Sequence, residues 1–88
     1  MESGKPVILY TRPGCHLCER VETLLRRLAV DWQPVDIESD SELEKIYGLL
    51  IPVVHIPASG QELAFPFDEG SLSDFLKEQG AWSPPLFQ

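Results

Sequence analysis

The two cysteines of this 88-residue chain, Cys15 and Cys18, are separated by two residues in the segment GCHLC. Three explanations for this spacing are open: a redox pair, half of a metal site, or two unrelated buried thiols. A disulfide between the two would close a very small loop and remove little entropy from the unfolded chain. Stabilising the fold is therefore not a sufficient reason for the pair.

The first cysteine stands between a predicted strand and a predicted helix. Residues 6–10 are a short apolar run typical of a buried strand, and residues 11–14 (TRPG) form a loop. From Cys15 onward the apolar residues recur at helical spacing. The free N–H groups and positive dipole end of a helix start stabilise a thiolate, and such cysteines have pKa values lowered to about 3.5–7.5. We therefore predict that Cys15 is the nucleophile and that Cys18, one turn further in, resolves the mixed disulfide.

Two basic side chains flank the predicted nucleophile. His16, as an imidazolium, would favour the thiolate and make the pair more oxidising, and the alternative is a solvated first-turn residue. Arg12 would add positive charge or bind a substrate carboxylate, and the alternative is an ordinary exposed loop arginine. The sequence leaves both pairs of alternatives open.

A metal site is the second explanation for the cysteines. A closed zinc site needs four ligands, and the chain offers at most Cys15, Cys18, His16 and His55. His16 lies between the two thiols in sequence and is badly placed to point with them at one ion, so we expect no complete zinc site and no metal. An iron–sulfur cluster shared across a dimer, with thiols from outside the chain, remains an alternative.

The composition predicts one acidic globular domain. The net charge of −7, from 14 acidic and 7 basic residues, argues against binding to nucleic acid or an anionic membrane. The N-terminal apolar run is too short for a secretion signal or a membrane span, so we expect a cytoplasmic monomer. The domain is predicted over residues 1–80. The Pro-rich tail, residues 81–88, is either loosely packed or docks Trp82 or Phe87 on this domain or on a partner.

Three further strands are predicted after the first helix. Residues 31–37 form a weaker strand, which Pro34 places at a sheet edge because proline donates no ladder hydrogen bond. Strands at residues 51–56 and 62–67 are joined by a short turn, which predicts an antiparallel hairpin. The first two strands are joined through a helix and should be parallel with a right-handed crossover.

Two further helices are predicted from capping patterns. Ser39 precedes Glu42 by three residues, and the pattern repeats from Ser71, so each serine is expected to open a helix. Gly48 and Gly80 are the expected ends. The side chains expected to face inward are Leu43, Ile46, Tyr47, Leu72, Phe75 and Leu76. The order β-α-β-α-β-β-α predicts an α/β fold with a mixed four-stranded sheet and helices on both faces.

Ile51-Pro52 opens the third predicted strand. The ordinary interpretation is a proline at a strand start. The functional interpretation is a cis-proline beside the CxxC. It would leave the backbone groups of Ile51 free, and a bound thiol substrate could pair with them as a short added strand.

Together these residues resemble the glutaredoxins, within the thioredoxin-like superfold. The resemblance covers residues 5–79 and depends on TRPGCHLC after a strand, IPVV further along, and the element order. The segments CHLCE, YGLLIPVV and FPFDEGSL look most like small bacterial glutaredoxin-like proteins. Two departures stand out. His-Leu replaces the usual Pro-Tyr or Pro-Phe between the cysteines, and FPFDEG replaces a Gly-Gly followed by an acidic pair.

The resemblance implies a thiol–disulfide oxidoreductase that reduces protein or glutathione mixed disulfides and requires no metal or organic cofactor. It implies Cys15 as nucleophile, Cys18 as resolving thiol and Pro52 as the cis-proline, with glutathione as a reductant. The residues implied for a glutathione groove are Arg12, Ile51, Val53, Asp68 and Glu69. Two rivals stay open: a binding module that keeps the fold without redox chemistry, and an iron–sulfur carrier dimer.

Overall fold

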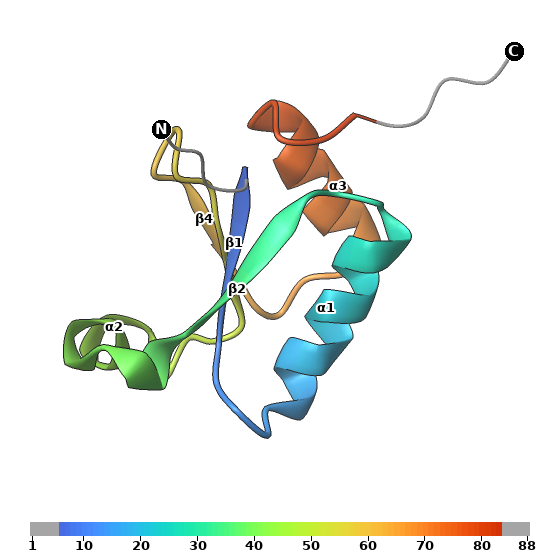
Figure 1. Cartoon of the computed structure of the whole chain (residues 1–88). Coiled ribbons are helices and arrows are strands. Elements are labelled where there is room, and N and C mark those ends of the chain that lie inside the picture. The colour runs from blue at the N-terminus through green and yellow to red at the C-terminus, as the bar shows by residue number, and fades with distance from the viewer. Residues whose placement is uncertain (1–5, 84–88) are drawn as a thin grey trace, which may run out of the picture.

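The computed structural model describes residues 6–83, which form one mixed sheet and three α-helices (Figure 1). The strands are β1 (Val7–Thr11), β2 (Trp32–Asp36), β3 (Val53–His55) and β4 (Glu62–Ala64). The helices are α1 (His16–Arg27), α2 (Ser41–Tyr47) and α3 (Glu69–Glu78), with a 3-10 turn η1 (Ile37–Ser39) before α2. The strand order is β2-β1-β3-β4, with β1 and β2 parallel and the other pairs antiparallel. The predicted order of elements and mixed four-stranded sheet are confirmed.

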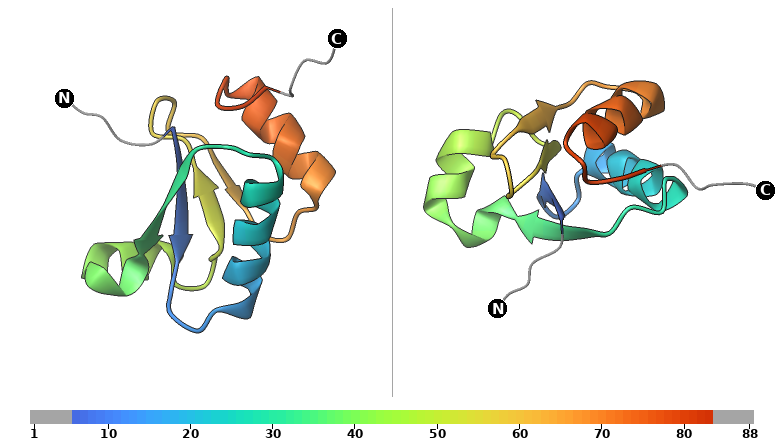
Figure 2. Two further views of the ribbon diagram at one scale, coloured as in Figure 1. Left: turned by 45° about the vertical axis from the view of Figure 1, so that its right-hand side comes forward. Right: turned by 90° about the horizontal axis from the view of Figure 1, so that it is seen from above.

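Helices cover both faces of the sheet, as the sequence predicted. Viewed from above, α1 and α3 lie on one side and α2 lies on the other (Figure 2). The main core lies under α1 and α3, where alternate residues of β1, Val7 and Leu9, meet Val21 and Leu25 of α1. Leu72 and Leu76 of α3 complete it. The alternate residues of β1 and the apolar stripe of α1 therefore face the same core.

A smaller core lies under α2. It contains Ile37, Tyr47 and Val53, with Tyr10 and Leu43 packed against it. Ile46 was predicted to face inward, and this is wrong, because its side chain is 55% exposed. Helix α2 has only seven residues and meets the sheet through Leu43 and Tyr47, which are four apart. Ile46 falls outside that stripe and points to solvent.

The caps of α2 and α3 differ from the predicted ones. Asp40 caps α2 by accepting the Glu42 N–H at 2.8 Å, because Ser39 belongs to η1 and its hydroxyl donates to the Asp36 carbonyl oxygen. Helix α3 begins at Glu69, and its N-cap is Asp68, three residues before the predicted cap Ser71. Aspartate is as good an N-cap as serine, so an acidic residue just ahead of a serine can start the helix earlier.

Strand β2 is one residue shorter at each end than predicted, and strands β3 and β4 are half as long as predicted. Strand β3 begins after Pro52, and β4 ends at Ala64, two residues before Pro66. Proline carries no N–H and cannot continue a ladder, which limits both strands. Strand β2 lies at the sheet edge, as Pro34 predicted.

The chain after α3 packs back onto the domain as far as it is described. Gly80 adopts a φ of +69°, and the N–H of the following alanine returns to the Leu76 carbonyl oxygen. The Trp82 indole Nε1 donates to the Leu28 carbonyl oxygen at 2.5 Å, and its ring packs against the main core. Phe87, the other aromatic residue named in the docking alternative, lies outside the described residues. Between residues 6 and 83, no helix is long and apolar enough to cross a bilayer.

Candidate active site

Cys15 and Cys18 occupy the start of α1. Cys15 is the N-cap, and Cys18 lies in the first turn. The two Sγ atoms are at disulfide distance, and the Cα atoms are 5.2 Å apart, within the usual range for a disulfide. The Cys18 N–H donates to Cys15 Sγ at 3.1 Å. A backbone donor and the helix dipole thus both act on the sulfur of Cys15, and both favour its thiolate form.

The two sulfurs differ in accessibility. Cys15 is half-buried and lines an open cleft with Arg12, whereas Cys18 is buried. Gly14, at a φ of +76°, makes the turn that brings Cys15 to the helix start, a backbone conformation that favours glycine. Cys15 is therefore the more accessible of the two cysteines, in agreement with the unequal roles predicted for them.

Arg12 is tied to α2 rather than free in the loop. Its guanidinium donates to Glu44 Oε2 at 2.9 Å and lies 3.8 Å from Glu38 Oε2. It also donates to the Gly48 carbonyl oxygen at 3.4 Å. The sequence left three roles open for Arg12: added positive charge, a bound substrate carboxylate, or an ordinary exposed loop arginine. The ion pair with Glu44 was not predicted, because Glu44 is 32 residues away and no local spacing connects the two.

His16 is solvated. Its side chain is 94% exposed, and its Nδ1 lies 3.8 Å from Glu19 Oε1. The charge of such an exposed group is strongly screened by water, so its influence on Cys15 is small. The geometry agrees with a solvated first-turn residue.

Pro52 lies at the same end of the sheet as the CxxC loop. Val53 pairs with Tyr10, so Pro52 lies beside the end of β1, which leads into that loop. The Ile51–Pro52 peptide bond is cis. The expectation that the backbone of Ile51 is free is wrong for its N–H, which donates to the Tyr47 carbonyl oxygen at 3.1 Å.

Val53 and the Pro52 carbonyl are also held by the sheet. The Pro52 carbonyl oxygen accepts the Phe65 N–H at 3.0 Å. Val53 is buried and paired on both sides, with Tyr10 and with Ala64. The ladder therefore fixes this end of β3 from two directions.

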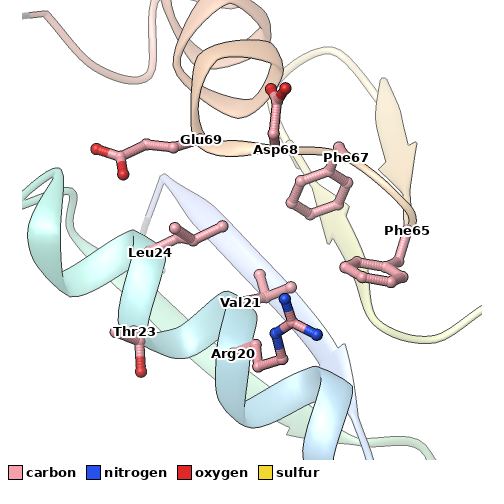
Figure 3. A pocket seen from close by; sticks show the side chains of 8 residues that line it. All are labelled: Arg20, Val21, Thr23, Leu24, Phe65, Phe67, Asp68 and Glu69. Carbon is pink, nitrogen blue, oxygen red and sulfur yellow. The ribbon is translucent and has the colours of Figure 1, made fainter.

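Asp68 and Glu69 line a different cleft from Arg12 and Cys15. This cleft, of about 400 Å³, lies between α1 and the segment that joins β4 to α3 (Figure 3). Its other lining residues are Arg20, Val21, Thr23, Leu24, Phe65 and Phe67. The rings of Phe65 and Phe67 meet edge to face at 5.6 Å, and Glu69 pairs with Arg27 at 3.3 Å. The structure thus places Asp68 and Glu69 in one cleft and Arg12 in another, and neither cleft is lined by Ile51 or Val53.

The Asp68 cap should make stability depend on pH. The N–H of Ser71 donates to the Asp68 carboxylate at 2.8 Å, and this hydrogen bond lowers the pKa of Asp68. The ionised cap therefore stabilises the fold above the unfolded-state pKa of about 3.9, and the contribution is lost as the pH falls through the lower folded-state pKa. When the pH is lowered from about 7 to about 2.5, we expect the free energy of unfolding to fall less in Asp68→Asn, which keeps a capping oxygen, than in the native protein. Urea midpoints at both pH values test this, and equal losses would contradict it.

A polar cluster that sequence reasoning missed joins α2 to the hairpin. The rings of Tyr10 and Tyr47 stack at 4.3 Å, and the Tyr47 hydroxyl donates to Glu62. His55 Nδ1 lies 2.8 Å from the same Glu62 oxygen. Burial and the Glu62 carboxylate raise the pKa of both tyrosines. Strand alternation could have predicted that Tyr10 and Glu62 share one face of the sheet, but it could not have predicted that Tyr47 contacts them.

Across residues 6–83, no three His, Cys, Asp or Glu side chains gather as a metal site.

The chain is similar to known proteins over most of its length. The family described as "Glutaredoxin-like domain (DUF836)" matches residues 6–77. The X-ray structure of protein XcR50 from X. campestris is 38% identical, with a TM-score of 0.76 over 82% of this chain and 96% of that one. A buckwheat glutaredoxin–glutathione complex shares the fold at 23% identity and a TM-score of 0.63, over 90% of this chain and 83% of that one.

A match among curated proteins is shorter. The Gene 56 protein of Mycobacterium phage L5 is 36% identical over 52 residues, which are 59% of this chain and 50% of that protein. The aligned segment thus spans half the length of that relative.

Proposed function

Since the chain belongs to the glutaredoxin-like domain family (DUF836), we propose that it is a thiol–disulfide oxidoreductase that reduces disulfides with Cys15 and Cys18. The observation that carries the proposal is the setting of Cys15. It caps α1, accepts the Cys18 N–H at 3.1 Å, and has the second sulfur at disulfide distance. An accessible thiol stabilised as a thiolate beside a buried partner thiol suits disulfide exchange.

The reaction takes place in two exchange steps. The Cys15 thiolate attacks one sulfur of the substrate disulfide, a mixed disulfide forms, and the other substrate sulfur leaves as a thiolate. Cys18, losing its proton, then attacks Cys15 Sγ and releases the second substrate sulfur. The substrate gains two electrons and two protons, and the protein is left with the Cys15–Cys18 disulfide.

A thiol reductant must return the pair to the dithiol. Two molecules of a monothiol such as glutathione do this, and they leave as one oxidised disulfide. A glutaredoxin of the same fold binds glutathione. For Arg12 to hold a glutathione carboxylate here, it must first leave Glu44. We place the reaction in the cytoplasm, because its reducing thiol pool can regenerate the dithiol. We also expect the protein to be a monomer.

A redox titration tests the proposed function. Protein is equilibrated in glutathione buffers of graded potential, acid-quenched and alkylated, and the labelled thiols are counted by mass spectrometry. We expect Cys15 and Cys18 to become protected together, in one two-electron transition. In the reduced protein, Cys15 should alkylate with a pKa below the ordinary value of about 8.5. The proposal fails if the two cysteines never form an intramolecular disulfide and Cys15 has an ordinary pKa.

A further inference from the structure

Large apolar side chains are exposed near the end of α2. Ile46 is 55% exposed, Leu49 is fully exposed and Leu50 is 48% exposed. We call these three residues the α2 ridge. The remaining large apolar side chain exposed among the described residues is Leu17, which lies between the two cysteines. Single exposed apolar residues are ordinary, but a concentration of them around one site indicates an interaction surface.

The α2 ridge is continuous with the cleft that contains Cys15. The ridge residues line an open cleft of about 500 Å³ together with Arg12. Arg12 also lines the cleft of Cys15. Helix α2 and the loop between β1 and α1 lie at the same end of the sheet (Figure 1). A chain segment lying on the ridge can therefore extend over Arg12 toward Cys15.

The surroundings of the α2 ridge are acidic. Residues 36–48 contain five acidic side chains and one basic side chain, Lys45. Glu38 and Glu44 share the single charge of Arg12, and Glu42 reaches Lys45 only at 3.9 Å with both side chains well exposed. The local charge is thus negative, as is the charge of the whole chain, −7. A partner with basic residues beside apolar ones complements this surface.

Two other occupants fit the α2 ridge less well. A second copy of the chain would bring the same acidic residues against the ridge, and like charges across an interface oppose association. A small anionic thiol such as glutathione has no apolar part that could cover three aliphatic side chains. The occupant that fits is a protein segment.

We propose that the α2 ridge docks a basic, apolar segment of a disulfide-bearing protein, which makes such proteins better substrates than small disulfides. This inference rests on the proposed function of Cys15 and Cys18. The exchange steps and the thiol reductant are those given above. The ridge contributes by holding the substrate disulfide near Cys15, which raises the effective concentration of the reacting sulfur.

Three disulfide probes test the preference in the native protein. The first is a synthetic peptide with an intramolecular disulfide flanked by leucines and lysines, and the second replaces its lysines with glutamates. The third is bis(2-hydroxyethyl) disulfide. We expect kcat/KM for the lysine peptide to exceed that for the glutamate peptide about tenfold, with the difference shrinking in high salt. Equal values for the two peptides would overturn the inference.

A substitution in the α2 ridge is the second test of the docking surface. Because Leu49 is fully exposed, Leu49→Ser should leave the fold intact, and Leu49→Met is the matched control that keeps an apolar side chain. We expect Leu49→Ser to lower kcat/KM for the lysine peptide about fivefold or more and Leu49→Met to lower it much less. Bis(2-hydroxyethyl) disulfide reduction and the reduction potential should not change in either variant. An unchanged peptide rate in Leu49→Ser overturns the ridge alone, whereas failure of the native protein to reduce any probe overturns the proposed function as well.

Discussion

A Cys15→Ser variant will reduce disulfides at least about a thousandfold more slowly than the native protein. The thiolate is the reacting species, and a serine hydroxyl at the same place cannot ionise near neutral pH. The fold should survive the change, because Cys15 is the N-cap of α1 and serine is a preferred N-cap residue. Its hydroxyl oxygen can accept the Cys18 N–H that now meets Cys15 Sγ. Turnover of bis(2-hydroxyethyl) disulfide with glutathione, beside a circular dichroism spectrum, measures both effects.

Cys18→Ser is the matched control, with the same chemical change at the buried position. The Cys15 nucleophile is retained, so the first exchange step proceeds and a mixed disulfide accumulates in stoichiometric amount, visible by intact mass. Comparable first-step rates in the two variants would contradict the unequal roles. Normal function in the cell with Cys15→Ser would favour the alternative of a binding module without redox chemistry.

The placement of the cysteines could be predicted because it depends on local signals. A strand, a Pro-Gly turn and an apolar stripe of helical spacing are contiguous in residues 6–28, so Cys15 had to stand at a helix start. The edge position of β2 also followed from one residue, Pro34, which donates no ladder hydrogen bond. Such features depend on the chain immediately around them.

The partners of the site residues could not be predicted for the opposite reason. Arg12 meets Glu44 across 32 residues, and Tyr47 meets Glu62 across 15 residues. Each contact depends on how the short helix α2 lies on the sheet, and a seven-residue helix has too little apolar pattern to fix that orientation. The exposure of Ile46, one of the three α2 ridge residues, could not be predicted for the same reason.

The N-cap of α3 lies three residues before the predicted one, because two caps compete there. Asp68 and Ser71 are both acceptable N-caps, and sequence pattern alone does not rank them. In the structure Asp68 accepts the Ser71 N–H, which places Ser71 inside the helix. The earlier start makes Asp68 the N-cap of α3 and Glu69 its first residue, and both line the cleft beside Phe67.

The substitution expected to cost most stability is Leu25→Ala in the main core. Leu25 lies on α1, is fully buried, and packs in the cluster that joins α1 to β1, β3 and α3. Replacing a buried leucine with alanine removes apolar contact and leaves a cavity, at a cost of about 2–5 kcal/mol in the free energy of unfolding. A domain of 88 residues has about 4–13 kcal/mol in total, so the loss is a large fraction of it.

Leu24→Ala is the matched control on the same helix. Leu24 is only partly buried and lines the cleft beside Phe65 and Glu69, so solvent can enter the space its side chain leaves. We expect Leu24→Ala to lower the free energy of unfolding by less than half as much as Leu25→Ala. Urea unfolding of both variants, with the two cysteines kept reduced, measures this. Thermal midpoints should fall by about 10–30 °C for Leu25→Ala. Equal losses in the two variants would mean that the helix stripe is not what holds α1, and hence Cys15 at its start, against the sheet.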